Sequence, residues 1–275
     1  MTAAQRPIGI FDSGIGGLTV TAAIKQALPM ECLLYFGDTL HVPYGPRSLE
    51  EVRAFSFAIT EALLDQGAKV IVIACNTASA AALRSLREAY PDVPFVGMEP
   101  AVKPAVEHTR SGVVGVIATV ATFQSALYAT IVERFAKDVT VLRQPCPGLV
   151  KQIENGDFDT PETETMLRGW LQPMMDANID ALVLGCTHYP IVRPVIERIL
   201  GPTVRVIDPA PAIARQLQRI LDRDGIRNSQ LTNEPDLYFT SGDPTSFLRM
   251  MERLGLDGFD VAQGKWENDG TLTLP

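Results

Sequence analysis

The sequence predicts an α/β fold of two similar doubly wound lobes, with mainly parallel sheets, a pseudo-twofold relation and the active site in the cleft between the lobes. Short apolar runs alternate with helical patterns along the 275 residues, as in parallel sheets whose strands are joined by helices. The runs are rich in Val, Ile and Leu, which is typical of strands covered on both faces. A weak internal repeat indicates that two halves share this arrangement.

Eight apolar runs are predicted strands, and five patterns with helical spacing lie between them. The strands are expected at residues 7–12, 31–38, 69–75, 93–98, 112–118, 138–143, 180–186 and 203–208. The helices are expected at residues 17–28, 48–67, 78–90, 122–136 and 162–178.

The internal repeat relates GIFDSGIGGLTV, which begins at Gly9, to GVIATVATFQSA, which begins at Gly115. Two proline-containing stretches, GMEPAVKPAVEH and VIDPAPAIA, mark candidate turns between the halves. We therefore expect a first lobe of residues 1–97 plus 209–275 and a second lobe of residues 98–208.

The composition restricts the class of protein. A formal net charge of −8 and a pI near 5.0 leave no basic stripe for nucleic acid. No apolar run has membrane-spanning length, and MTAAQRPIGIF lacks the basic and apolar regions of a signal peptide, so we expect a cytoplasmic protein with no membrane partner. In that compartment the four cysteines are expected to be free thiols.

Two cysteines follow predicted strands in matching positions, Cys75 in ACNTAS and Cys186 in GCTHYP. Ligands of open α/β sheets bind beyond the carboxyl ends of the strands. A lone cysteine is most often a small buried hydrophobe, but a matched pair favours a function. Residue types that cap a helix start follow each of them, namely Asn76 and Thr77 in one half and Thr187 and His188 in the other.

The stretch DSGIGG, residues 12–17, invites comparison with a dinucleotide-binding turn. It fails the spacing test, because Thr19 occupies the third glycine position, and Asp12 would repel a phosphate. A glycine turn between strand and helix is expected. The carboxylate of Asp12 suits a substrate ammonium, and the hydroxyl of Ser13 suits a carboxylate.

The loop DTLHVPYGPRS, residues 38–48, is dense in turn-forming residues. It is either a surface connection or a turn that directs the phenol of Tyr44 and the bare backbone N–H of Gly45 at a ligand. Thr119 and Thr122 place hydroxyls in the corresponding part of the second half; alone, they would be helix caps.

His188 has three interpretations. As a zinc ligand it lacks the paired Cys/His spacing of structural sites. As the base of a cysteine hydrolase it leaves Cys75 without a role. As a proton partner of Cys186 it fits. The remaining histidines and cysteines, His41, His108, Cys32 and Cys146, have no such context, and both cysteines are expected to be structural.

Two thiols that face each other across a cleft suit a reaction whose two directions are near mirror images. In a racemisation, one thiolate removes the α-proton from one face while the opposite thiol delivers a proton to the other. A thiol with a pKa of about 8.5 must be activated, and hydrogen bonds to the substrate carboxylate must stabilise the enediolate-like intermediate. We expect no metal ion.

At these motifs the sequence resembles the glutamate racemase family, within the aspartate/glutamate racemase superfamily. GIFDSGIGGLTV, YFGDTLHVPYGPRS, ACNTASA, CPGLVKQIENGD and LGCTHYPI occur in the family's order and spacing across the whole chain. The resemblance implies a homodimeric, cofactor-independent enzyme that interconverts L- and D-glutamate and supplies D-glutamate for bacterial peptidoglycan. It also implies that Cys75 and Cys186 are the two thiols.

The resemblance further implies that Asp12 assists Cys75, while Glu154 and His188 assist Cys186. By itself, Glu154 in QIENGD would be a solvated acid at a helix end. In the repeat the residue equivalent to Asp12 is Ala118, so the second thiol needs helpers from elsewhere. The expected substrate-binding positions are Asp12, Ser13, Tyr44, Gly45, Asn76, Thr77, Thr119, Thr122, Thr187 and His188.

Two positions depart from the family pattern: Ala121 stands where glycine is common and Lys151 where proline is common. Three alternatives remain beside glutamate racemisation. An aspartate racemase would keep the chemistry, because amino acids one methylene apart are told apart by pocket depth. A two-lobed amino-acid binding protein would have no need of two thiols, and a cysteine amidohydrolase would need only one.

Overall fold

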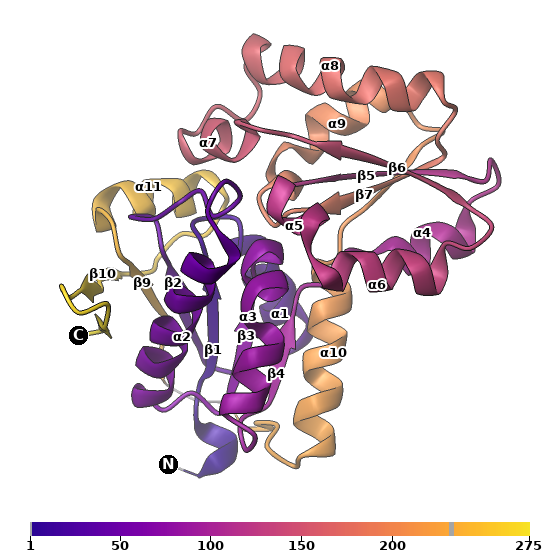
Figure 1. Ribbon diagram of the computed structural model, residues 1–275. Coiled ribbons are helices and arrows are strands. Elements are labelled where there is room, and N and C mark those ends of the chain that lie inside the picture. Colours follow the sequence, from indigo (N-terminus) through magenta and orange to yellow (C-terminus); the bar gives the residue numbers. More distant parts are fainter. Residues whose placement is uncertain (1, 231–233) are drawn as a thin grey trace.

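The computed structural model describes residues 2–230 and 234–275, and its main strands form two sheets (Figure 1). The first sheet has the order β10-β9-β2-β1-β3-β4, the second has the order β6-β5-β7-β8, and all pairings within them are parallel. The predicted α/β fold is therefore confirmed, and all eight predicted strands form. Met1 and residues 231–233, which fall in the predicted first lobe, lie outside the described residues.

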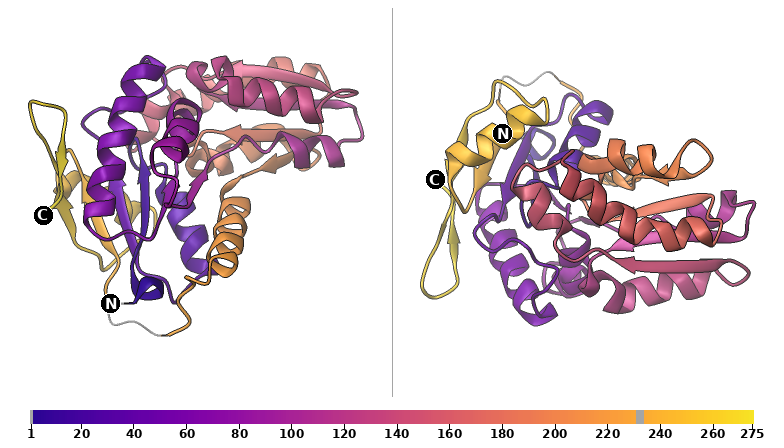
Figure 2. Two further views of the ribbon diagram at one scale, coloured as in Figure 1. Left: turned by 60° about the horizontal axis from the view of Figure 1, so that its bottom comes forward. Right: turned by 90° about the horizontal axis from the view of Figure 1, so that it is seen from above.

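Strands of the first sheet come from both ends of the chain. They are β1 (Ile8–Asp12), β2 (Leu33–Gly37), β3 (Val70–Ile73), β4 (Phe95–Gly97), β9 (Leu237–Thr240) and β10 (Val261–Gln263). The second sheet contains β5 (Val113–Ala118), β6 (Thr140–Pro145), β7 (Ala181–Gly185) and β8 (Arg205–Ile207). A short antiparallel hairpin of β11 (Lys265–Trp266) and β12 (Leu272–Thr273) follows at the edge of the first lobe (Figure 2).

The two sheets repeat one local order, because β2-β1-β3-β4 in the first corresponds to β6-β5-β7-β8 in the second. The central strands β1 and β5 end at Asp12 and Ala118, the two residues that the sequence repeat equates. Cys75 and Cys186 follow the next strand in each sheet, β3 and β7. The lobe boundaries after residues 97 and 208 stay a prediction.

Helices cover both faces of each sheet. They are α1 (Leu18–Ala27), α2 (Leu49–Asp65), α3 (Asn76–Ala89), α4 (Val102–His108), α5 (Val120–Gln124), α6 (Ala126–Phe135), α7 (Leu149–Glu154), α8 (Pro161–Asp176), α9 (Arg193–Leu200), α10 (Ala210–Arg223) and α11 (Pro244–Arg253), with 3₁₀ turns η1 (Ala3–Gln5) and η2 (Tyr189–Val192). None of the helices within residues 2–230 and 234–275 is long and apolar enough to cross a membrane.

Side-chain alternation along the strands decides which helices cover which face. Ile8 and Ile10 of β1 belong to the same apolar cluster as Leu18 of α1 and Leu217 of α10, whereas Phe11 packs with residues of α2 and α3. Helix α10 lies beside α1, which returns the chain to the first sheet (Figure 1). The apolar cluster that contains Ile8 and Ile10 continues into α8 and α9 of the second lobe, so one apolar core joins the two sheets.

The prediction of one helix over residues 122–136 is wrong, because α5 and α6 are separate. Ser125 between them is extended, with φ −74° and ψ 145°. Its hydroxyl oxygen accepts a hydrogen bond from the backbone N–H of Tyr128 at 3.1 Å, which caps α6. Serine is among the preferred capping residues, and an apolar periodicity that continues on both sides of such a cap conceals the break.

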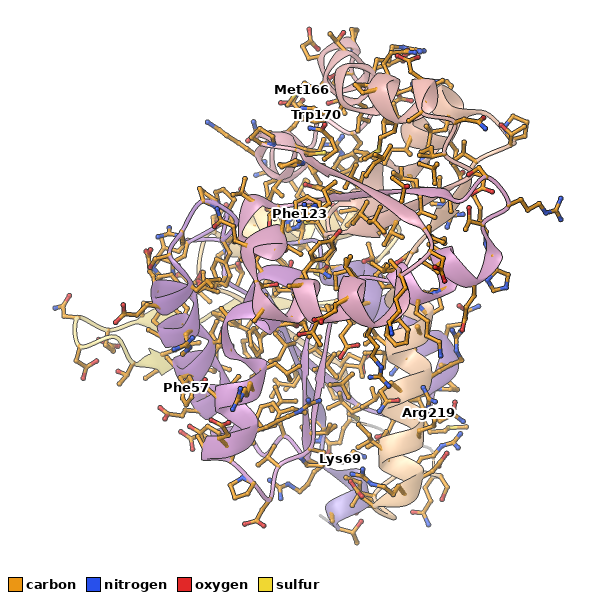
Figure 3. All side chains as sticks on the ribbon, turned by 45° about the vertical axis from the view of Figure 1, so that its right-hand side comes forward. Phe57, Lys69, Phe123, Met166, Trp170 and Arg219 are labelled. Atoms are coloured by element: carbon orange, nitrogen blue, oxygen red, sulfur yellow. The ribbon has the colours of Figure 1, made fainter. Side chains whose placement is uncertain are left out.

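A buried ion pair lies at one end of the first sheet, near the bottom of Figure 3, where Lys69 is labelled. Lys69 Nζ lies 2.5 Å from Glu31 Oε2, and the two side chains are 2% and 1% exposed. Because removal of one partner leaves an uncompensated buried charge, we expect Lys69→Met to lower the free energy of unfolding by about 3–5 kcal/mol.

Urea denaturation followed by circular dichroism measures this loss. Arg84→Met, which breaks the exposed i,i+4 pair with Glu88, is the control and should change the free energy by no more than about 0.5 kcal/mol. An equal effect of the two substitutions would contradict the assignment of the Lys69 pair to the core.

Candidate active site

The carboxylate of Asp12 organises the turn that follows β1. Asp12 is fully buried, and its Oδ2 accepts hydrogen bonds from the backbone N–H groups of Gly14 at 3.2 Å and Gly17 at 2.9 Å. Thr187 from the second lobe donates its hydroxyl to Oδ1 at 3.3 Å. Burial raises the pKa of Asp12, and the nearby His188 opposes that rise.

Two glycines of this turn are required by the close approach of the second lobe. A Cβ atom added at Gly14 would lie 1.9 Å from Glu154 Oε1, and one added at Gly16 would lie 2.4 Å from His188 Nδ1. A side chain at either position would have to displace the Glu154 carboxylate or the His188 imidazole. The expected glycine turn is therefore present, and its glycines also leave space for the Glu154 carboxylate and the His188 imidazole of the other lobe.

Cys75 lies at the junction of β3 and α3 and is 4% exposed. It caps the helix itself, because its Sγ accepts from the backbone N–H of Ala78 at 3.5 Å, and the hydroxyl of Ser13 lies 3.9 Å from the sulfur. Asn76 and Thr77 lie in the first turn of the helix, so the prediction that they cap it is wrong. Burial, and then the charge of Asp12, raise the pKa of Cys75 well above its usual value.

The side-chain amide of Asn76, next to Cys75, lacks a hydrogen-bond partner among the described residues. The residue is 2% exposed, and within the described part of the chain neither its Oδ1 nor its Nδ2 has a hydrogen-bond partner. Burying an amide without a partner is unfavourable, and native structures contain few such groups. An amide that is unpaired beside the Cys75 thiol is therefore placed to bind a polar ligand.

Cys186 follows β7 and faces a hydrogen-bonded relay. His188 Nδ1 lies 3.9 Å from Cys186 Sγ, and its Nε2 lies 2.6 Å from Glu154 Oε1. Glu154 ends α7, and the same Oε1 accepts from the backbone N–H of Ile15 at 2.9 Å. The acid at the predicted helix end is thus 13% exposed rather than solvated, and it joins the second lobe to the turn after β1.

The prediction that Thr187 and His188 cap a helix is wrong. The 3₁₀ turn η2 begins directly after His188, and no side-chain hydrogen bond caps it. The hydroxyl of Thr187 instead turns toward Asp12, and the imidazole of His188 turns toward Cys186 and Glu154. Short polar residues at a strand end therefore serve long-range contacts here, which a local pattern does not reveal.

The pKa of His188 is raised well above its usual value. Burial alone would lower it, but the hydrogen bonds with Cys186 and Glu154 and the charges of Glu154 and Asp12 outweigh burial. The imidazole of His188 therefore holds its proton at neutral pH and places a positive charge beside the Cys186 thiol.

The loop of residues 38–48 lies against both lobes. Tyr44 is 1% exposed, and its hydroxyl donates to Asp38 Oδ2 at 2.6 Å. A Cβ atom at Gly45 would lie 3.0 Å from the side chain of Thr119 in the second lobe. Of the two alternatives, a simple surface connection does not describe this loop, because the phenol is buried.

Three threonine hydroxyls form a chain between the lobes. Thr77 Oγ1 lies 3.0 Å from Thr119 Oγ1, which in turn lies 2.9 Å from Thr122 Oγ1. Thr119 also caps α5 through the backbone N–H of Thr122 at 3.2 Å. A cavity of about 140 Å³ lies beside this chain, between residues 43–46 and residues 146–151.

The other singled-out cysteines and histidines have different surroundings, although Cys146 lines the cavity beside the threonine chain. Cys32 precedes β2, with its Sγ 3.2 Å from the backbone oxygen of Glu234, and Cys146 is buried in the apolar core. His41 contacts Asp38, and His108 is exposed. Within residues 2–230 and 234–275, no group of three or more Cys, His, Asp or Glu is arranged to hold a metal ion.

The sequence reasoning missed Asp38 and Tyr35. Asp38 is fully buried beneath Tyr44, and Tyr35 donates its hydroxyl to the backbone oxygen of Gly14 at 2.7 Å. Asp38 directly follows β2 in YFGD, as Asp12 ends β1 in IGIFD, so its strand-end position was a usable signal. No local signal distinguishes Tyr35 from other aromatic core residues.

A family model described as Asp/Glu/Hydantoin racemase matches residues 8–217, which is more than half of the chain. The chain belongs to this family.

Similar members of this racemase family have been named and solved. A glutamate racemase from Ectopseudomonas mendocina is 51% identical over 88% of this chain and 92% of its own length. The crystal structure of a glutamate racemase isoform from Bacillus anthracis superposes with a TM-score of 0.85 at 37% identity, covering 94% of this chain and 97% of that one. A glutamate racemase from Francisella tularensis, solved in complex with D-glutamate, gives a TM-score of 0.80 at 33% identity, covering 94% and 96%.

Close packing at Gly16 gives a prediction. Gly16→Ala should displace the imidazole of His188 and lower the thermal unfolding midpoint, because overpacking costs about 1–3 kcal/mol. Gly169→Ala on α8 is the matched control, since nothing lies within 4 Å of its added Cβ and alanine is the better helix former. Differential scanning fluorimetry should therefore show opposite shifts, and equal shifts would contradict the close contact.

The protonation of His188 gives a second prediction. Because the folded-state pKa is raised, this group stabilises the protein fully below its unfolded pKa of about 6.5, and that stability is lost as the pH rises through the folded value. The unsubstituted protein should therefore exceed His188→Gln in free energy of unfolding by an amount that decreases as the pH rises. Nitrogen NMR of labelled histidine should show an imidazolium signal at pH 7.5 that His188→Gln removes; a neutral His188 ring would contradict the assignment.

Proposed function

We propose that this protein is a cofactor-independent glutamate racemase that interconverts L- and D-glutamate by two-thiol proton transfer at the α-carbon. The observation that carries the proposal is the pair of buried thiols, one from each lobe, at the carboxyl ends of equivalent strands. They are close enough that the charge of Cys186 contributes to the raised pKa of Cys75. The family supports a racemase, and similar proteins from other bacteria carry the name glutamate racemase.

The proposed reaction moves one proton off the α-carbon and one onto it. A thiolate on one face accepts the α-proton, so that the C–H bond breaks, an S–H bond forms, and its electrons pass into an enediolate on the substrate carboxylate. The thiol on the opposite face then delivers its proton to the same carbon and becomes a thiolate. Atoms and charge balance, and the product leaves the two thiols in exchanged protonation states, ready for the reverse direction.

Each thiol has its own helper in this proposal. Burial keeps Cys75 protonated at rest, and the carboxylate of Asp12 beside it is placed to receive that proton before Cys75 acts as a base. The protonated His188, held by Glu154, is placed to stabilise a thiolate on Cys186. The substrate ammonium would lie nearest to Asp12 and offset its negative charge.

The remaining polar groups are proposed to bind the two substrate carboxylates. The unpaired amide of Asn76 is the clearest candidate, because a ligand carboxylate would satisfy it. The other groups are hydroxyls and a backbone N–H, from Ser13, Tyr44, Gly45, Thr77, Thr119, Thr122 and Thr187. Among them Tyr44 already donates its hydroxyl to Asp38, so its contact with substrate would use the ring or the hydroxyl oxygen.

The alternatives are less well supported. An amino-acid binding protein leaves the relay of Cys186, His188 and Glu154 without a purpose. A cysteine amidohydrolase leaves Cys75 without one. Aspartate remains the nearest alternative substrate, but the Francisella tularensis relative is described in complex with D-glutamate. We further propose the setting implied by the family resemblance, a cytoplasmic homodimer that supplies D-glutamate for peptidoglycan.

The decisive experiment is incubation of purified, metal-free protein with D-glutamate in deuterated water with no cofactor added. Optical rotation should decay to zero, and the α-proton NMR signal should disappear as deuterium enters the α-carbon. Exchange of aspartate instead of glutamate would overturn the substrate assignment. No exchange with any amino acid would favour the binding protein or the hydrolase.

The two-thiol step is tested with serine variants. Cys75→Ser and Cys186→Ser should each lower the rate of racemisation by at least about 100-fold, because each removes one proton carrier of the pair. Cys32→Ser is the matched control, since this cysteine lies outside the site and the variant should keep nearly full activity. Full activity in either of the first two variants would overturn the mechanism.

A further inference from the structure

Asp38 collects hydrogen bonds from distant parts of the chain. Its buried carboxylate accepts from Tyr44 Oη at 2.6 Å, Ser241 Oγ at 2.7 Å and Trp266 Nε1 at 2.9 Å, and His41 Nδ1 lies 3.0 Å from both oxygens. A carboxylate that is 0% exposed depends on such donors, because its charge has no water to solvate it. The position of Tyr44 is therefore tied, through one acid, to β9 and to the hairpin of β11 and β12.

An aromatic cluster reinforces the same connection. The His41 ring stacks on Phe55 of α2 with centroids 4.2 Å apart, and Trp266 meets their edges at 5.1 Å and 5.5 Å. The Tyr44 ring is tilted against Phe55, with the two centroids 5.7 Å apart. Edge-on and stacked ring pairs of this kind stabilise the packing beyond what the buried area alone provides. Trp266 thus packs against His41 and Phe55 and also donates a hydrogen bond to Asp38.

The hairpin itself is held against the first lobe. Leu272 of β12 is buried in the apolar cluster that contains Phe36 and Val52, and Trp266 packs against that cluster. Figure 2 shows the hairpin at the outer edge of the first lobe, remote from the second sheet. Trp266 supplies the hairpin's hydrogen bond to the loop, while Leu272 shares the apolar cluster of the first lobe with Tyr44. Ser241 and Trp266 also lie beyond residues 8–217, the part that the family model matches.

We propose that Trp266 is a positioning residue: the hairpin of residues 265–273 sets the place of loop 38–48 through Asp38 and thereby the affinity for substrate. This inference rests on the proposed function only where it concerns glutamate. Loop 38–48 carries Tyr44 and Gly45 to the interface with Thr119, so a shift of the loop moves both groups relative to the second lobe. Groups that bind the substrate carboxylates equally in the ground state and the transition state alter KM rather than kcat.

The test compares Trp266→Phe with Trp170→Phe. The first keeps an aromatic ring but removes the N–H that Asp38 accepts. The second makes the same substitution at the chain's other tryptophan, on α8 in the second lobe, where Figure 3 labels it far from the hairpin. In Trp266→Phe we expect amide hydrogen exchange in residues 39–47 to rise. We also expect KM for glutamate to rise by about fivefold, which is less than the full worth of one charge-assisted hydrogen bond, because the loop keeps its other contacts. The kcat should change less than about twofold, and Trp170→Phe should match the unsubstituted protein.

A second substitution separates positioning from packing. In an Asp38→Asn background the hydrogen bond from Trp266 meets an amide instead of a carboxylate, so the further change Trp266→Phe should raise KM much less than it does alone. Additive effects of the two substitutions would overturn the route through Asp38. A lower unfolding temperature with unchanged loop exchange and KM would show a purely structural hairpin and overturn the proposal.

The outcomes also distinguish this inference from the proposed function. If the unsubstituted protein does not racemise glutamate, the proposed function fails, and hydrogen exchange in residues 39–47 alone decides whether Trp266 holds the loop. If it does racemise glutamate and Trp266→Phe equals Trp170→Phe in both loop exchange and KM, the proposed function stands and the positioning role is wrong.

Discussion

The site depends on the contact between the glycine turn after β1 and the hydrogen-bonded pair of Glu154 and His188. Glu154 Oε1 accepts from both the Ile15 N–H at 2.9 Å and the imidazole at 2.6 Å, so one oxygen joins the two lobes. The contact forms only because Gly14 and Gly16 have no side chains. With the turn in place, Asp12 reaches Cys75 from one side while His188 reaches Cys186 from the other. Both thiol environments are therefore set by the same closely packed interface.

The lobes repeat a strand order but not a chemistry. Asp12 and Ala118 end equivalent central strands, and only the first carries a proton acceptor. The second thiol obtains its helpers from outside the repeat, from α7 and from His188 two residues further along its own loop. The helpers also differ in sign, because a carboxylate lies beside Cys75 and an imidazolium lies beside Cys186. A mirror-image reaction is thus served by two thiol environments that differ in their charged neighbours.

Whether a feature could be predicted from the sequence depends mainly on how far apart in the chain its interacting residues lie. The strands and the places of Cys75 and Cys186 were predictable, because apolar runs and strand ends are local features of the chain. The break at Ser125 was not, since the helical pattern continues across it. The partners of Tyr44 were not either, because Asp38 is anchored by Trp266 from 228 positions further along the chain. Glu154 was identified from the family resemblance alone, and its pattern by itself indicated a solvated helix end.

The neutral donors around Cys75 are compatible with the raised pKa of its thiol. Within residues 2–230 and 234–275, neither lysine nor arginine donates a hydrogen bond to Cys75 or Cys186. A fixed cation beside Cys75 would bind a substrate carboxylate strongly, but it would also lower the pKa of the thiol and make its thiolate a weaker base. An α-proton is far less acidic than a thiol, so a weaker base would transfer it more slowly. Amide, hydroxyl and backbone donors bind an anion without lowering the basicity of the Cys75 thiolate. Formation of that thiolate then depends on Asp12 and on the substrate ammonium. The ammonium is present only when substrate is bound and there is a proton to move.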